Sequence, residues 1–196
     1  MEALNDERKR YTSDEFLAMT DLPEHCELID GYIYEKYGST SAEMSAAPNT
    51  LHQRISGEIF AEIRDYIKNN HGKCAYFHAP FDVRLNEYNT VQPDILVVCD
   101  PDKIDNKRCV GAPDWVIEIL SPSNENLDMK KKMFLYRNSG VREYWIVDPE
   151  DENVLVYVFG KPNTIGFYTF NDEITVNIYK DAPQLLSICI KKLLEK

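Results

Sequence analysis

The chain has 196 residues, of which 43% are hydrophobic and 28% charged, enough for one domain with a sizeable core. Its formal net charge of -11 opposes binding to nucleic acid at long range, so a DNA-binding protein of this composition needs a local basic patch. No apolar run approaches the roughly 20 residues that cross a bilayer, and the polar opening MEALNDERKRYTSDEF is unlike a secretory signal. We therefore expect a cytoplasmic protein that does not contact the membrane.

The cysteines do not form a recognisable framework. They stand at positions 26, 74, 99, 109 and 189, and no two of them have the CxxC spacing of a metal knuckle. Their odd number argues against a full set of disulfides. We expect all five to be reduced and partly buried thiols.

Hydrophobic periodicity and turn residues divide the chain into helices and strands. We expect a flexible, charged lead over residues 1–10. Helical spacing with capping residues predicts three helices, over 12–19, 51–70 and 123–140. Alternation predicts a hairpin in 25–37, across Asp30 and Gly31, and strands over 74–85, 91–100, 114–121 and 142–149, with a polar connection over 100–113. An antiparallel meander is predicted over 153–160, 166–171 and 173–179, whereas residues 185–196 fit neither pattern.

These elements describe an α/β fold in a single domain spanning residues 1–196. The strand, helix and strand between Trp115 and Val147 have the length of a crossover connection between parallel strands. Hairpins flank this unit and bring antiparallel pairing with them. We therefore expect a mixed central sheet flanked by helices, with the antiparallel meander added to it.

Two acidic residues interrupt the apolar strands. Glu118 lies in the middle of WVIEIL, where a buried carboxylate is costly unless a partner neutralises it, and alternation puts it on one face with Val116 and Leu120. Asp94 opens the preceding apolar run directly after Pro93, so neighbouring strands would bring the two carboxylates together. Such a pair suits Mg²⁺ or Mn²⁺, whose bound water can attack a phosphate ester.

The helix that follows Glu118 carries three successive lysines, Lys130, Lys131 and Lys132. Its first turns lie near the end of the Glu118 strand, where an ammonium can orient an attacking water or neutralise a phosphate. A solvated helix face is the simpler interpretation for two of the three. Another interpretation of the acids stays open, with Asp94 capping a turn and Glu118 paired to a nearby lysine.

Five phrases of the sequence resemble a known family. They are ELIDGYIY (27–34), VQPDILVVCDPDKI (91–104), GAPDWVIEILSPSN (111–124), DMKKKMFLY (128–136) and GVREYWIVDP (140–149). In this order they are similar to the putative restriction endonuclease family of bacterial proteins, within the PD-(D/E)XK nuclease superfamily. The resemblance runs from about Thr12 to Val158 and implies a restriction-endonuclease-like core with a metal-dependent phosphodiesterase site.

The resemblance also implies which residues form that site. Asp94 matches the acid of the PD motif, Glu118 matches the second acid, and Glu27 matches an acid expected near the metal. The wider superfamily has a lysine two residues after the second acid, where this chain has Leu120. The family is similar in having an apolar residue there, which implies that Lys132 is the catalytic lysine.

Two more residues are candidates for contact with the substrate. Lys130 would come within reach if the helix lay one turn from its expected place. His52 lies in a phrase that resembles the family's and would begin the long helix, although a histidine hydrogen-bonded locally at a helix start is the simpler interpretation. Tyr144 and Trp145 are expected to pack in the core rather than stack on bases.

The leading hypothesis is a metal-dependent endonuclease that hydrolyses phosphodiester bonds in DNA with Mg²⁺ or Mn²⁺. A basic track would come from the three helix lysines with Arg137 and Arg142. Cutting both strands needs two sites, so we expect a homodimer, with the meander from Val154 to Tyr179 as a candidate interface. Two alternatives stay open. One is a non-catalytic interaction module on the same fold, and the other is a metal-dependent hydrolase of a small phosphorylated substrate, which an acidic surface suits better.

Overall fold

The architecture is given by a computed structural model that describes residues 9–23, 25–35, 49–121, 127–160 and 162–195. Most of the expected lead (1–8), the end of the predicted hairpin (36–37) and the start of the helix predicted over 123–140 (123–126) lie outside these residues. The α-helices are α1 (Ser13–Ala18), α2 (Thr50–Asn69), α3 (Leu127–Ser139) and α4 (Ile190–Leu194). The first three confirm the helices predicted from periodicity, and Thr12 caps α1 in a capping box with Glu15.

A six-stranded mixed sheet forms the centre of the molecule, as expected. Its strands are, in spatial order, β11 (Thr164–Thr169), β10 (Asn153–Val158), β9 (Glu143–Asp148), β8 (Trp115–Ile119), β6 (Ile95–Val98) and β3 (Ala75–His78). β8 and β9 are parallel and joined through α3, which confirms the predicted crossover, and the other neighbours are antiparallel. The first two strands of the predicted meander therefore extend this sheet.

A second sheet was not expected. It consists of β2 (Tyr32–Glu35), β1 (Cys26–Ile29), β5 (Asn89–Val91), β4 (Asp82–Asn86) and β7 (Arg108–Val110). The prediction of single strands over 74–85 and 91–100 was wrong. Each segment divides at a proline, Pro80 or Pro93, into two strands, one in each sheet. Proline has no N–H for a strand ladder, which is why the pairing stops there. The polar connection predicted over 100–113 also contains a short 3-10 helix (Pro101–Lys103) and β7.

The end of the chain folds back as a small separate sheet. β12 (Ile174–Thr175) and β13 (Ser187–Ile188) pair antiparallel, and a 3-10 helix (Asn177–Tyr179) follows β12. The third strand predicted for the meander, over 173–179, is thus only two residues long. The segment that fitted no pattern becomes β13 and α4.

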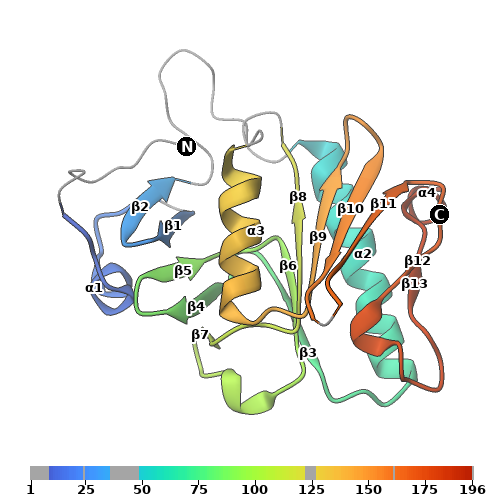
Figure 1. The fold of residues 1–196 in the computed structure, drawn as a ribbon, viewed down its shortest axis with the longest axis horizontal. Helices are drawn as coiled ribbons and strands as arrows, with labels where there is room; N and C mark the ends of the chain where they lie inside the picture. Colours follow the sequence, from blue (N-terminus) through green and yellow to red (C-terminus); the bar gives the residue numbers. More distant parts are fainter. Residues whose placement is uncertain (1–8, 24, 36–48, 122–126, 161, 196) are drawn as a thin grey trace.

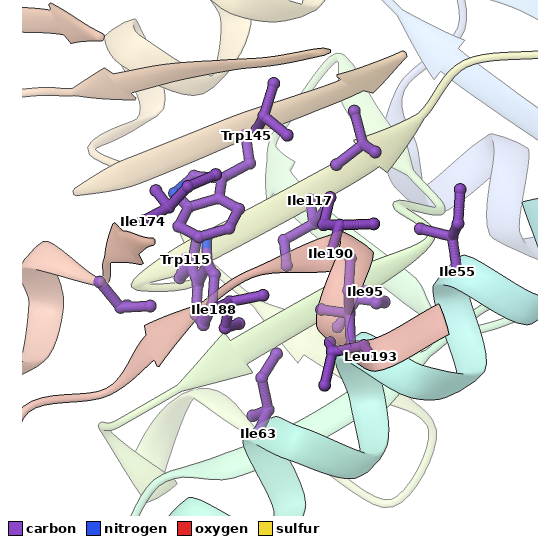
Figure 2. Packing of buried hydrophobic residues seen from close by; sticks show 14 of the residues in the cluster. Ile55, Ile63, Ile95, Trp115, Ile117, Trp145, Ile174, Ile188, Ile190 and Leu193 are labelled. Carbon is purple, nitrogen blue, oxygen red and sulfur yellow. The ribbon is translucent and has the colours of Figure 1, made fainter. Parts of the chain in front are cut away.

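α2 and α3 lie on opposite sides of the six-stranded sheet (Figure 1). On the α2 side, the isoleucines of that helix pack with Trp115 and Trp145, over which Ile174 and Ile188 close the cluster (Figure 2). On the other side, α3 contributes Tyr136 to a cluster that includes residues of both larger sheets. Trp145 and Tyr144 are buried, as predicted. α3 therefore lies between the two sheets, and this placement creates the site described below.

The expectation for the cysteines was wrong at two positions. Cys74 and Cys99 form a disulfide, whereas Cys26, Cys109 and Cys189 are buried free thiols. Cys74 precedes β3 and Cys99 follows β6, next to the register pair Ala75 and Val98, so the fold sets the two side by side. Sequence spacing gives no sign of this, because the two residues are 25 positions apart. None of the described helices has both the length and the apolar character that crossing a membrane requires.

Candidate active site

The carboxyl group of Glu118 is buried on the α3 side of the central sheet, with a side chain that is 8% exposed. Val116 and Leu120 contribute to the cluster on that side and Ile117 to the opposite one, which confirms the predicted alternation. Two donors on α3 reach Glu118 Oε1: Lys132 Nζ at 3.0 Å and the Tyr136 hydroxyl at 2.8 Å. The partners of this buried acid therefore include a lysine and a tyrosine of the following helix.

The same lysine also binds Glu27, which is fully buried on β1 of the other sheet. Lys132 Nζ donates to Glu27 Oε1 at 3.0 Å and lies 2.8 Å from Oε2, a contact with the distance of an ion pair but without hydrogen-bond geometry. The main-chain N–H of Gln92 also donates to Glu27 Oε1, at 2.9 Å. One ammonium thus joins a carboxyl group from each sheet.

Asp94 lies beside this pair, directly before β6, and is 3% exposed. One register step beyond the pair formed by Ile95 and Ile117, it comes opposite Glu118. The main-chain N–H of Ile119 donates to Asp94 Oδ2 at 2.8 Å. We call Glu27, Asp94, Glu118 and Lys132 the acid–lysine cluster. The structure brings all four residues predicted for catalysis to one end of the central sheet.

His52 belongs to the surroundings of this cluster. The residue is 4% exposed and its Nε2 lies 3.3 Å from Asp94 Oδ2, while its Nδ1 has no hydrogen-bond partner within the described residues. The local hydrogen bond expected for a histidine at a helix start is present, but it does not involve the ring. Only the main-chain N–H of His52 makes that bond, to Asn49 Oδ1. The first turn of α2 therefore carries the ring toward Asp94.

The other basic residues considered for the site do not belong to the acid–lysine cluster. Lys130 is exposed, and Lys131 lies 5.4 Å from the centre of the Tyr34 ring. Arg142 pairs with Asp114 at the opposite end of β8 from Glu118. These positions remove Arg142 from the basic track and leave exposed residues of α3 as its source.

Sequence reasoning missed Tyr136. Its ring is fully buried, and burial raises the pKa of its hydroxyl well above the ordinary value, with Glu118 and Glu27 adding to the effect. The phenol therefore stays a proton donor to Glu118. The signal was its position four residues after Lys132, which puts both side chains on one helix face.

The chemistry of these side chains fits a divalent cation. The acid–lysine cluster has three carboxyl groups but only one ammonium, and oxygen ligands are those that Mg²⁺ and Mn²⁺ prefer. Two of the acids, Asp94 and Glu118, come from adjacent strands. Among the described residues, no group of three or more His, Cys, Asp or Glu side chains has the arrangement of a metal site. A cation bound here would thus share the acids with Lys132.

The proteins similar to this chain include one of known structure and one known from its sequence. A crystal structure of a putative nuclease belonging to DUF820 from Anabaena variabilis matches with a TM-score of 0.72 and 23% sequence identity, over 94% of this chain and 97% of that one. This likeness concerns the fold, and it confirms the expected fold class. The uncharacterized protein slr1290 of Synechocystis is 26% identical over 133 residues, which are 67% of this chain but less than two thirds, 64%, of that protein.

Most of the chain also matches a protein family. Residues 13–180 match the model of Uma2, described as putative restriction endonuclease, and this segment contains every member of the acid–lysine cluster. The match begins at α1 and ends just after the 3-10 helix at Asn177–Tyr179. The chain therefore belongs to the Uma2 putative restriction endonuclease family.

Proposed function

We propose that the protein is a metal-dependent endonuclease that hydrolyses phosphodiester bonds in DNA. The observation that carries the proposal is the buried acid–lysine cluster, in which Lys132 joins Glu27 to Glu118 while Asp94 lies on the adjacent strand. A purely structural role is a poor account of three buried carboxyl groups gathered with one lysine, because burying charged groups is costly. Family membership supports a nuclease in general.

In this proposal Asp94 and Glu118 hold Mg²⁺ or Mn²⁺, with Glu27 nearby. The cation, when bound, supplies positive charge to the phosphate and lowers the pKa of a bound water. Lys132 keeps its ammonium beside the acids and orients the attacking water or neutralises the phosphate. Tyr136 fixes the carboxyl group of Glu118 by its hydrogen bond, and the His52 ring lies against the carboxyl group of Asp94.

A second candidate is a metal-dependent hydrolase of a small phosphorylated substrate. The net charge of -11 favours it, as does the ion pair that holds Arg142 at the far end of β8. The same acids would act on both classes of substrate. The two functions differ only in whether a polymeric polyanion is accepted.

The test is cleavage of supercoiled plasmid and of single-stranded DNA with Mg²⁺ or Mn²⁺. Asp94→Asn should lower the rate by at least about 100-fold, since loss of even an indirect metal contact commonly costs 10–100-fold. Asp181→Asn, an exposed aspartate near the C-terminus, is the matched control and should cleave like the wild type. Equal cleavage by the wild type and Asp94→Asn would contradict the proposal.

Further assays separate the alternatives if DNA stays intact. Metal-dependent hydrolysis of bis(p-nitrophenyl) phosphate, lost in Asp94→Asn, would favour the small-substrate hydrolase. Calorimetric titration with Mn²⁺ tests the remaining case. A wild type that binds no metal and cleaves neither substrate would favour the interaction module.

A further inference from the structure

The outermost strand of the central sheet, β11, is an unprotected edge. No other strand of the described residues pairs with its outer side. Its sequence, TIGFYT, has no charged residue, although 28% of the chain is charged. Its pairing with β10 runs through six consecutive register pairs without a bulge. Exposed edge strands ordinarily carry charges, prolines or bulges that prevent further pairing, and β11 has none of them.

The main-chain N–H and C=O groups of every second residue of β11 point outward from this edge. Phe170 N–H donates to Glu152 O, which fixes the alternation along β11. The groups of Ile165, Phe167 and Thr169 then face away from β10. Consistent with this, Thr169 N–H donates to Asp172 Oδ2 at 2.7 Å, which closes the edge at that end. The remaining outward-facing residues are Ile165 and Phe167, and each has one main-chain N–H and one C=O directed away from β10.

The side chains of the same two residues form an apolar surface. Ile165 is 67% exposed and Phe167 is 68% exposed, more than any other exposed large hydrophobic residue described. Their register partners on β10, Tyr157 and Leu155, are half-buried and pack against the cluster on the α3 side. We call Leu155, Tyr157, Ile165 and Phe167 the apolar strip. The apolar strip extends from the buried cluster on the α3 side to the open edge of the sheet.

We infer that β11 is the interface for a second copy of this chain, paired antiparallel across a two-fold axis at Gly166. In this register Ile165 of each copy lies opposite Phe167 of the other copy. Each of these two pairs exchanges two hydrogen bonds, and the four side chains meet on one face. The two six-stranded sheets become one continuous sheet.

Charge and symmetry favour a second copy over another partner. A chain of net charge -11 repels its own copies wherever charged surfaces meet, and β11 is a six-residue stretch free of charge. A two-fold interface requires a surface that is complementary to itself. The exchange of Ile165 and Phe167 about Gly166 satisfies that condition. The inference is independent of the proposed function.

The first test is the oligomeric state of the full chain, measured by sedimentation velocity. The wild type should be a dimer, whereas Ile165→Lys and Phe167→Lys should be monomers with unchanged circular dichroism, because both side chains are two-thirds exposed. Leu185→Lys, at a 51% exposed leucine outside β11, is the matched control and should stay dimeric. A monomeric wild type, or a dimer that persists in both lysine variants, would overturn the inference.

The second test fixes the register by crosslinking. Across the proposed axis, the two Cα atoms at position 166 lie about 4.5 Å apart, within reach of a disulfide. Gly166→Cys should therefore form a covalent dimer on oxidation, after the Tyr168 ring turns aside from the new Cβ, which it meets at 2.4 Å. In Thr164→Cys the two Cα atoms are about 13 Å apart, so it should not crosslink. Crosslinking of Thr164→Cys but not of Gly166→Cys would exclude this register.

Discussion

Lys132 on α3 donates a 3.0 Å hydrogen bond to Oε1 of Glu118 on β8, and both side chains are at least nine-tenths buried. The same ammonium contacts Glu27, so its removal leaves two buried carboxyl groups without their shared cation. Lys132→Met should therefore lower the free energy of unfolding by about 3–5 kcal/mol near neutral pH. Urea denaturation measures this change. Lys130→Met, an exposed lysine on the same helix, should change it by less than about 0.5 kcal/mol.

The lysine variant also tests the metal site without an activity assay. If the acids bind a cation, Mg²⁺ or Mn²⁺ should raise the stability of Lys132→Met more than that of the wild type, since the variant has more uncompensated charge. A Lys132→Met protein as stable as the wild type would show that the ion pair is not the main compensation for Glu118. Equal stabilisation by metal in both proteins would argue against a shared site.

Tyr136→Phe removes the second donor to Glu118 Oε1, whose distance from the hydroxyl is 2.8 Å. A hydrogen bond to a charged group contributes about 1.5–3 kcal/mol, so the free energy of unfolding should fall by that amount. Tyr157→Phe, a half-buried tyrosine on β10, is the control and should have a smaller effect. Cleavage by Tyr136→Phe should decrease but stay above that of Lys132→Met. The reverse order would mean that the hydroxyl, and not the ammonium, acts on the substrate.

Reduction of the Cys74–Cys99 disulfide should destabilise the protein by about 3 kcal/mol, because the bond closes a loop across 25 positions and restricts the unfolded chain. The measurement is urea denaturation with and without dithiothreitol. The Cys74→Ser/Cys99→Ser variant should match the reduced wild type and be insensitive to the reductant. A wild type that responds no more than this variant would indicate that the bond does not form in solution.

Glu143 predicts a pH dependence of stability. Its side chain is fully buried and its pKa is raised by that burial, although Trp145 Nε1 and Ile178 N–H donate to its two oxygens. A raised pKa means that the folded protein holds the proton more tightly. Its contribution is complete below the ordinary carboxyl pKa and is lost as the pH rises through the raised value.

The comparison with Glu143→Gln isolates this contribution. The stability of the wild type relative to the variant should increase as the pH is lowered from 7 toward 5, in a series of urea denaturations. A difference that grows in the opposite direction would show that the site prefers the carboxylate form. Other carboxyl groups titrate in the same range, but both proteins share them, so their contribution cancels in the difference when ionic strength is equal.

Local patterns in the sequence were enough for part of the site. Strand alternation predicts which way Glu118 points, and the helix that follows it directly brings Lys132 back toward the same end of the strand. These relationships lie within fourteen residues of one another. The role of Glu27 came only from the family resemblance, because it reaches Lys132 from a sheet that no local pattern predicts, 105 residues away.

The second sheet and the disulfide could not be predicted for a related reason. Periodicity reports how a strand faces the core but not which strand lies next to it. Pro80 and Pro93 were visible signals of a break, yet nothing local shows that the two halves of each strand belong to different sheets. The pairing of Cys74 with Cys99 depends on the register of β3 with β6, which is likewise a long-range property.

The division of the acid–lysine cluster between two sheets makes function more fragile than folding. Glu27 belongs to one sheet and Glu118 to the other, and α3 between them carries the lysine that joins both (Figure 1). A small slip between the sheets would separate these side chains while each sheet keeps its own hydrogen bonds. Activity should then disappear at a lower denaturant concentration than secondary structure does, so that inactivation precedes unfolding.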